Sequence, residues 1–79
     1  MKPVIFTIQA RWDPEASVWW GRSEEVPVAA EAATLDALLA KAAAQTLDLL
    51  RDNHPGVEPE QVHLQMLVLH EASSVPDAA

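Results

Sequence analysis

The three histidines are the side chains best suited to hold a metal ion, since the chain of 79 residues has no cysteine. His63 and His70 are seven positions apart in a segment that reads as an extended strand, and an odd separation turns the two side chains to opposite faces. His54 lies in a predicted turn before that strand. Because a metal ion requires ligands that converge on one point, this spacing favours surface histidines, and we expect no metal and no other cofactor.

The paired carboxylates are the next candidates, because two carboxyl groups can act as the acid and the base of a reaction. Asp13 and Glu15 lie in a predicted turn, and Glu24 and Glu25 stand in a connection between two strands. Acid–base catalysis needs a carboxyl group that is partly removed from water, so that its pKa shifts, whereas turn residues are solvated. We therefore interpret these four residues as surface charges.

Nucleophile and phosphate motifs are missing from the sequence as well. No serine stands in a nucleophile elbow, and the two glycines, Gly21 and Gly56, are too far apart to form a phosphate-binding loop. Without cysteine there is no thiol nucleophile and no thiolate metal site. The sequence therefore predicts a protein that is not an enzyme.

The charge of the chain limits the range of its partners. Twelve acidic and five basic side chains give a formal net charge of −7, and the basic residues are scattered. Nucleic acids and anionic membranes require clustered Lys and Arg, so neither is an expected partner, and a basic protein is the better match. The sequence shows no signal peptide and no apolar run of about 18 residues, so we expect a cytoplasmic protein without a membrane segment.

The elements that position these side chains begin with a predicted hairpin. Residues 3–12 alternate between apolar and polar side chains, as a strand with one buried face does. Asp13 and Pro14 start a turn over residues 13–16, because Asp can bond to the backbone ahead of it and Pro presets the φ angle of a type I turn. A return strand over residues 17–23 completes the hairpin.

The register of the hairpin decides which tryptophan is buried. Trp19 and Trp20 are adjacent, so their side chains must point to opposite sides of the sheet. If Trp12 lies opposite Trp19, Gly21 faces Ala10 on the core side and leaves room for a helix, while Trp20 faces outward. A slip of one residue reverses this assignment.

One helix and a short strand follow the hairpin. Residues 24–27 read as a connection, and residues 28–32 form a short third strand at an edge of the sheet. Thr34 is the predicted N-cap of a helix that extends to residue 52. Residues 53–56 end this helix, because Asn and Gly tolerate left-handed geometry and Pro cannot continue a helix. The apolar stripe of the helix has a spacing of 3.6 residues and consists of Leu35, Leu38, Leu39, Ala42, Thr46, Leu49 and Leu50.

The last predicted strand covers residues 61–71 and carries apolar side chains on both faces. This pattern is typical of a strand in the sheet interior, or of one whose open side meets a partner. We expect one domain over residues 1–72 and a frayed tail over residues 73–79.

The order β-β-β-α-β predicts an α+β domain in which one helix covers one face of a four-stranded sheet. No second helix is available for the other face, so that face stays uncovered in a monomer. It would carry Ile5, Leu67, Leu69 and one tryptophan of the adjacent pair, Trp20 in the register above, which is a large apolar area for a lone domain. A chain this short buries only about 60% of its unfolded surface, so we also expect a homodimer.

The segment from residue 12 to residue 42 resembles the N-terminal domain of HicB-type antitoxins, and more closely a related group of small uncharacterised bacterial domains. An acidic turn leads to a strand with aromatic residues, then to an acidic residue followed by Val and Pro, a short strand and a Thr-Leu helix start. The resemblance covers about residues 3–52, and Val28 departs from it, since the pattern usually has Gly there. The matching positions are Trp12, Asp13, Val18, Trp19, Ser23, Glu25, Val26, Pro27, Glu31, Thr34 and Leu35.

This resemblance implies a partial ribonuclease-H-like fold with the sheet order 3-2-1-4, a last strand parallel to the first, and the helix as the crossover. It also implies an inactive domain that covers a small basic RNA-cleaving toxin, a role that an acidic surface suits.

Two functional hypotheses follow from the sequence. In the first, a HicB-like interaction domain binds a small basic toxin-like protein through the open sheet face and the acidic loops. In the second, the chain is a homodimeric structural module without a toxin, whose exposed face closes on itself. The predicted partner interface consists of Trp20, Leu67, Leu69, Ile5, Asp13, Glu15, Glu24 and Glu25.

Overall fold

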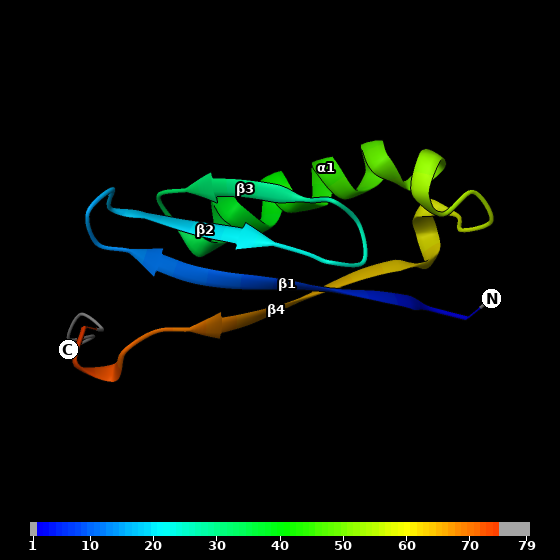
Figure 1. Cartoon of the computed structure of the whole chain (residues 1–79). Coiled ribbons are helices and arrows are strands. Elements are labelled where there is room, and N and C mark those ends of the chain that lie inside the picture. The colour runs from blue at the N-terminus through cyan, green and yellow to red at the C-terminus, as the bar shows by residue number, and fades with distance from the viewer. Residues whose placement is uncertain (1, 75–79) are drawn as a thin grey trace.

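The computed structural model describes residues 2–74 as a four-stranded mixed sheet with one long helix on one of its faces (Figure 1). The sheet order is β3-β2-β1-β4, with β1 antiparallel to β2 and parallel to β4. Both the α+β class and the sheet order are therefore confirmed. The elements are β1 (Val4–Asp13), β2 (Val18–Arg22), β3 (Ala29–Ala32), α1 (Leu35–Asn53) and β4 (Val62–Leu69), with short 3₁₀ turns at Pro59–Gln61 and Ala72–Ser74.

The hairpin between β1 and β2 forms as its turn residues predict. Asp13 Oδ1 accepts hydrogen bonds from the backbone N–H groups of Glu15 and Ala16, at 3.1 and 3.3 Å. Ser17 has a φ of 54°, in the left-handed region, so β2 begins at Val18 and not at residue 17.

The register of the hairpin pairs Trp12 with Trp19 and Ala10 with Gly21. Of the two registers that the sequence leaves open, this is the one that turns Trp20 away from the helix. A Cβ atom at Gly21 would lie 3.0 Å from Ile8 Cγ2 and 3.2 Å from Leu38 Cδ2. The glycine therefore allows α1 to pack closely on the sheet.

The helix begins as predicted, because the Thr34 hydroxyl accepts a hydrogen bond from the Ala37 N–H at 3.1 Å. Its predicted stripe is buried at four positions and reaches the surface at Leu39, which is 38% exposed. The buried positions are Leu38, Ala42, Thr46 and Leu50.

The predicted end of the helix is wrong in its detail. Asn53 is still helical and donates its side-chain amide to the Leu49 carbonyl, and neither glycine has a positive φ. Instead, His54, with φ −143° and ψ 69°, caps the helix, and its N–H bonds to the Leu50 carbonyl at 2.8 Å. Pro55 then prevents continuation.

The connection between β2 and β3 supplies core side chains. Val26 is 0% and Val28 is 2% exposed, and both pack in the main core cluster with Phe6 and Ile8. A hydrogen bond of 2.7 Å from the Val28 N–H to the Val26 carbonyl closes a tight turn around Pro27. The position at which the family pattern usually has Gly is therefore a core position in this chain.

The last strand is shorter than the predicted range of residues 61–71. Gln61 belongs to a 3₁₀ turn, where its side chain accepts from the Glu58 N–H and donates to the Lys2 carbonyl. At the other end, residues 72–74 form a second 3₁₀ turn, and the rest of the predicted tail, residues 75–79, lies outside the described residues. Within residues 2–74, no helix combines the length and the apolar character needed to cross a lipid bilayer.

Candidate protein-interaction surface

The sheet face opposite α1, here called the open face, is not covered by any element of the described chain. Figure 1 shows α1 behind β2 and β3, while the other side of the sheet faces the viewer. Strand alternation places Ile5, Trp20, Leu67 and Leu69 on this open face. The four apolar residues of the predicted interface thus share one face of the sheet, and their contact with a partner stays a prediction.

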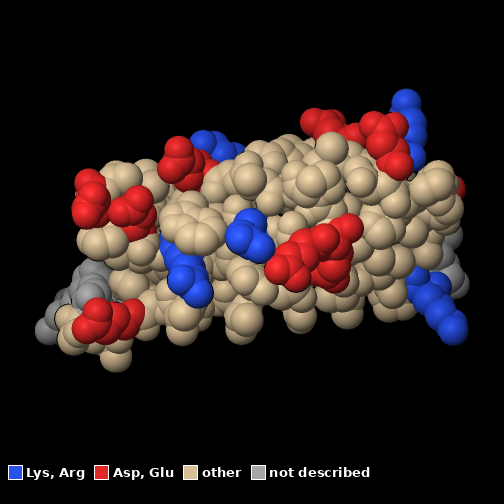
Figure 2. Space-filling model, in the orientation of Figure 1, with Lys and Arg blue, Asp and Glu red and all other residues tan. Residues whose placement is uncertain are grey.

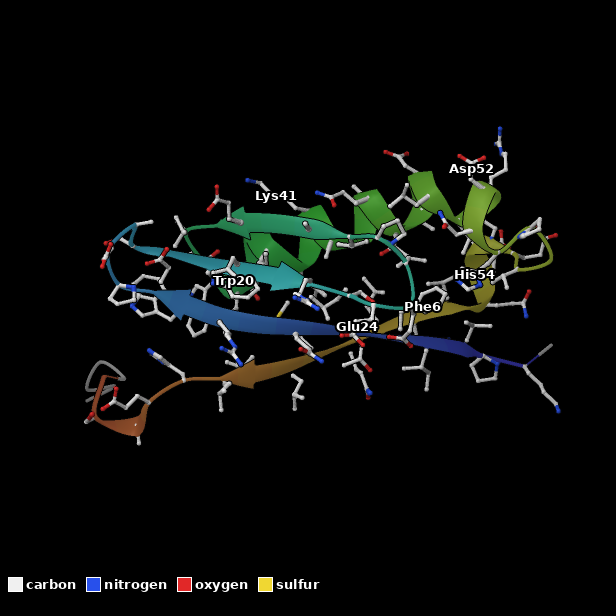
Figure 3. All side chains as sticks on the ribbon, in the orientation of Figure 1. Phe6, Trp20, Glu24, Lys41, Asp52 and His54 are labelled. Carbon is white, nitrogen blue, oxygen red and sulfur yellow. The ribbon has the colours of Figure 1, made fainter. Side chains whose placement is uncertain are left out.

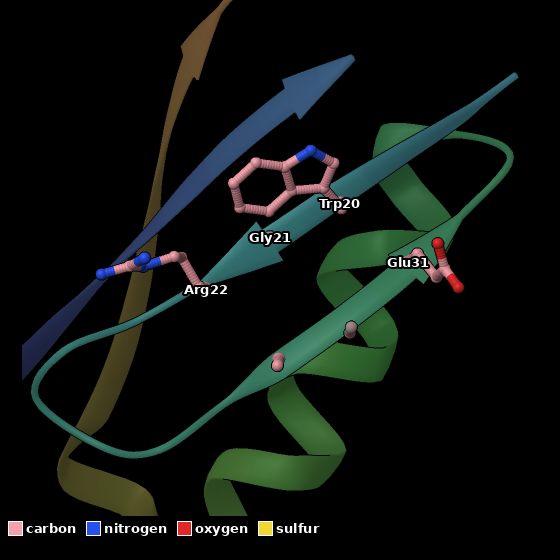
Figure 4. Close-up of a pocket in the computed structure, with 6 residues that line it drawn as sticks. Trp20, Gly21, Arg22 and Glu31 are labelled. Atoms are coloured by element: carbon pink, nitrogen blue, oxygen red, sulfur yellow. The ribbon is translucent and has the colours of Figure 1, made fainter. Parts of the chain in front are cut away.

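The centre of the open face holds one aromatic and two basic side chains. Trp20 pairs across the strands with Arg11 and is two residues from Arg22, so all three side chains share this face. A shallow hollow of about 330 Å³ lies beside the indole (Figure 4). The side chains of Trp20, Arg22 and Glu31 line it together with Gly21 and two alanines of β3.

The four predicted interface carboxylates do not form one cluster. Asp13 and Glu15 lie before β2, and Glu24 and Glu25 lie after it, so the two pairs are at opposite ends of a strand of five residues. At about 3.3 Å per residue, β2 alone separates them by roughly 13 Å. Figure 2 accordingly shows the acidic side chains as separate groups around the basic centre of this face.

Three of these carboxylates already have partners within the fold. Asp13 caps the hairpin turn, and Glu25 Oε1 accepts a hydrogen bond of 2.9 Å from the Thr7 N–H. Glu24 forms an ion pair of 3.2 Å with Arg22, but both side chains are mostly exposed, so the pair stabilises the fold little. Docking of a basic protein on Asp13 or Glu25 would compete with these structural bonds.

A second exposed apolar group lies at the C-terminal half of β4, and we call Leu67, Val68 and Leu69 the β4 rim. Their exposed fractions are 63%, 41% and 65%. Leu67 and Leu69 point to the open face, whereas Val68 points to the helix side. A hollow of about 270 Å³ lies between the rim and the neighbouring residues 9–11 of β1. The rim is therefore apolar on both faces of the sheet edge.

The other edge of the sheet, at β3, is closed by the helix. Lys41 Nζ donates to the Glu31 carbonyl at 2.8 Å, and Gln45 Oε1 accepts from the Ala29 N–H at 3.1 Å. In an antiparallel strand, residues two positions apart direct their backbone groups to the same edge. The bonded groups of residues 29 and 31 therefore both lie on the outer edge of β3. Sequence reasoning missed this feature, although the spacing of Lys41 and Gln45, one helical turn apart, is a usable signal.

The three histidines lie in different surroundings. The His54 ring packs against Phe6 in a tilted arrangement, with ring centroids 5.1 Å apart, and its Nε2 lies 3.0 Å from the Glu25 carbonyl oxygen (Figure 3). His63 is exposed on β4. Within residues 2–74, no three His, Asp or Glu side chains are placed to hold a metal ion.

The third histidine belongs to an aromatic cluster that the sequence analysis did not identify. The His70 ring is 5.0 Å from Trp19 and 6.3 Å from Trp12, and the two indoles are 5.4 Å apart. Its Nε2 is buried, without a hydrogen-bond partner among the described residues. The resemblance implied that the last strand pairs in parallel with the first. In the structure this pairing ends at Arg11 and Leu69, and so brings residue 70 beside Trp12.

Comparison with known proteins shows a family and a solved structure to which this chain is similar. The model of a family described as "Domain of unknown function (DUF1902)" matches residues 5–76. The crystal structure of hypothetical protein TTHA1013 from the extremely thermophilic bacterium Thermus thermophilus is similar, with 42% sequence identity and a TM-score of 0.72. That match covers 84% of this chain and 93% of the other. No curated protein matches the chain.

Proposed function

The chain belongs to the DUF1902 family, a family of unknown function, and from that premise we propose that it is a non-enzymatic domain that binds another protein through its open face. The observation that carries this proposal is the uncovered centre of the sheet, where Trp20 lies beside a hollow, opposite Arg11 and two residues before Arg22. Trp and Arg are the residue types that contribute most to binding energy at protein interfaces.

The geometry of this centre suits a protein ligand better than a small molecule. The hollow is shallow and only partly enclosed, so a small ligand would leave much of its surface in water, whereas binding pockets usually enclose most of the ligand. A protein segment could place one apolar side chain against the Trp20 indole and carboxylates near Arg11 and Arg22. We therefore expect the part of the partner that contacts this centre to be apolar with carboxylates beside it, while this contact sets no condition on the charge of its other surfaces.

Support for a non-enzymatic role comes from the carboxylates. Asp13 and Glu25 accept backbone hydrogen bonds that shape the hairpin turn and the connection after β2, so their oxygens already have a structural use. Glu15 and Glu24 are exposed in turns, and Glu24 pairs with Arg22.

A finer version of the proposal is that the partner is a small basic RNA-cleaving toxin. It rests on the resemblance to HicB-type antitoxins and on the net charge of −7, which would attract a basic protein over long distances. In this version the acidic groups around the open face meet the partner, and Trp20 still provides the central apolar contact.

Affinity capture from a native extract of the cells that encode the chain tests the proposal. The bait is compared with a Trp20→Lys variant and with a Leu47→Lys control, since Leu47 is an exposed apolar residue of α1, on the other side of the sheet. We expect a stoichiometric protein that binds wild type and Leu47→Lys but not Trp20→Lys. A basic nuclease among such proteins would support the finer version, and the lack of any Trp20-dependent protein would contradict the proposal.

A further inference from the structure

The two edges of the sheet differ in a way that points to self-association at one of them. At β3, a strand of only four residues, the side chains of Lys41 and Gln45 bond to two outward backbone groups, so a strand that pairs there must displace them. At β4, no described side chain bonds to the backbone of the free edge. Of the two edges, β4 is therefore the one open to strand addition.

The β4 strand also lacks the features that protect sheet edges from pairing. It has eight residues, twice the length of β3, and contains neither proline nor glycine. From residue 61 to residue 70 there is no Asp, Glu, Lys or Arg. Charged side chains, proline and short length are the usual means by which edge strands avoid other chains.

The exposed side chains of the β4 rim indicate how a chain bound at this edge would be oriented. Leu67 and Leu69 are exposed on the open face and Val68 on the helix side, so no ligand that binds one face can cover all three. A strand placed beside β4, in the plane of the sheet, would contact side chains on both faces at once. This arrangement differs from the face-on binding proposed above for the surface around Trp20.

The uncharged composition of β4 suits a second copy of the chain as the occupant. Two copies each carry a net charge of −7, so they repel unless their contact avoids the carboxylates. The uncharged stretch of residues 61–70 meets that condition. The chain is also extended for its length, with a radius of gyration of 13.9 Å against about 12 Å for a compact domain of this size, so its own core is small.

We propose that β4 pairs antiparallel with β4 of a second copy about a two-fold axis, which joins two four-stranded sheets into one continuous sheet. Antiparallel pairing brings the uncharged stretch of one copy against the same stretch of the other, as a two-fold interface requires. The open face around Trp20 remains accessible in such a dimer, so the dimer and the proposed partner site are independent.

Light scattering of the pure chain after size exclusion tests this dimer, over about 10 µM to 1 mM, where small interfaces associate. We expect a mass near twice 8.6 kDa for wild type and for Leu47→Lys. Leu67→Lys and Val68→Lys should each weaken association by at least about tenfold, since each removes apolar cross-strand contacts and places a charge on the edge strand, which opposes pairing. Circular dichroism establishes that each variant is folded.

Amide hydrogen exchange of the wild-type chain provides a second readout that needs no variant. Protection of the amides of residues 62–69 should rise with protein concentration, while that of β3 stays constant. A wild-type monomer over the whole range overturns the inference. So does a dimer that Trp20→Lys dissociates and Val68→Lys does not, because that result means face-to-face packing. If the chain is monomeric but still captures a Trp20-dependent protein, the dimer fails and the proposed function stands.

Discussion

Substitution of Gly21 by alanine tests the close packing of α1 on the sheet. The new Cβ would lie 3.0 Å from Ile8 Cγ2 and 3.2 Å from Leu38 Cδ2, and both of these side chains are 0% exposed. Carbon atoms in good contact are about 3.5–4.0 Å apart, so the neighbours must move by roughly 0.5 Å in a packed core. Overpacking of this kind costs about 1–3 kcal/mol.

Part of this cost is offset in the unfolded chain. Replacing a strand glycine by alanine reduces the freedom of the unfolded backbone and contributes about 0.5–1 kcal/mol of stability, since Gly21 has no positive φ that alanine would resist. We therefore expect a net loss of about 1 kcal/mol in the free energy of unfolding, and of about 2.5 kcal/mol at most. In a domain of this size, each kcal/mol corresponds to about 4–8 °C in Tm.

Thermal and urea unfolding followed by circular dichroism measure this effect, at one protein concentration because association shifts Tm. Gly56→Ala is the matched control, since an added Cβ would have no atom within 4 Å beyond the neighbouring residues of the chain, and the φ of Gly56 is not positive. It should raise stability by about 0.4–1 kcal/mol. The reasoning is refuted if Gly21→Ala is as stable as Gly56→Ala.

Two further predictions concern backbone groups that side chains satisfy. Thr34→Ala removes the acceptor of the Ala37 N–H and should lower the free energy of unfolding by about 0.5–2 kcal/mol in urea titrations; an unchanged urea midpoint would show that this cap contributes nothing. The double variant Lys41→Ala with Gln45→Ala exposes the outer edge of β3, so light scattering should reveal association beyond that of wild type, and an unchanged mass would show that these side chains do not protect the edge.

The sequence predicted the layers and the register of the sheet well, because these depend on periodic patterns. Alternation in residues 3–12 defined the buried face of β1. Trp19, Trp20 and Gly21 left two possible registers for the hairpin. The observed register is the one that places Gly21 beneath the helix. The helix start was equally clear, because Thr34 precedes an apolar stripe with a 3.6-residue period.

What the sequence could not give depends on contacts between distant segments. The burial of Val28 in a tight turn depends on the space left under α1, which no local pattern reports. The carboxylates looked alike in the sequence, yet Glu25 bonds to the backbone of Thr7, 18 residues away, whereas Glu24 pairs locally with Arg22. Such tertiary bonds separate structural carboxylates from those free to bind a partner.

The candidate surface was predicted in part for the same reason. Alternation placed Ile5, Leu67 and Leu69 on one face, but the exposure of Val68 on the opposite face became visible only with the position of α1. The helix lies against β2 and β3 and leaves the inner side of β4 partly uncovered (Figure 1). The exposure of the β4 rim on the helix side is therefore a consequence of helix placement rather than of strand pattern.

The measurement that tests the central claim most directly is the quantity of partner protein retained per immobilised chain, compared between wild type, Trp20→Lys and Leu47→Lys. If the open face binds another protein, wild type and Leu47→Lys retain a partner in stoichiometric amount and Trp20→Lys loses at least about 90% of it, as removal of a central tryptophan does at interfaces. Equal retention by all three chains would contradict the claim.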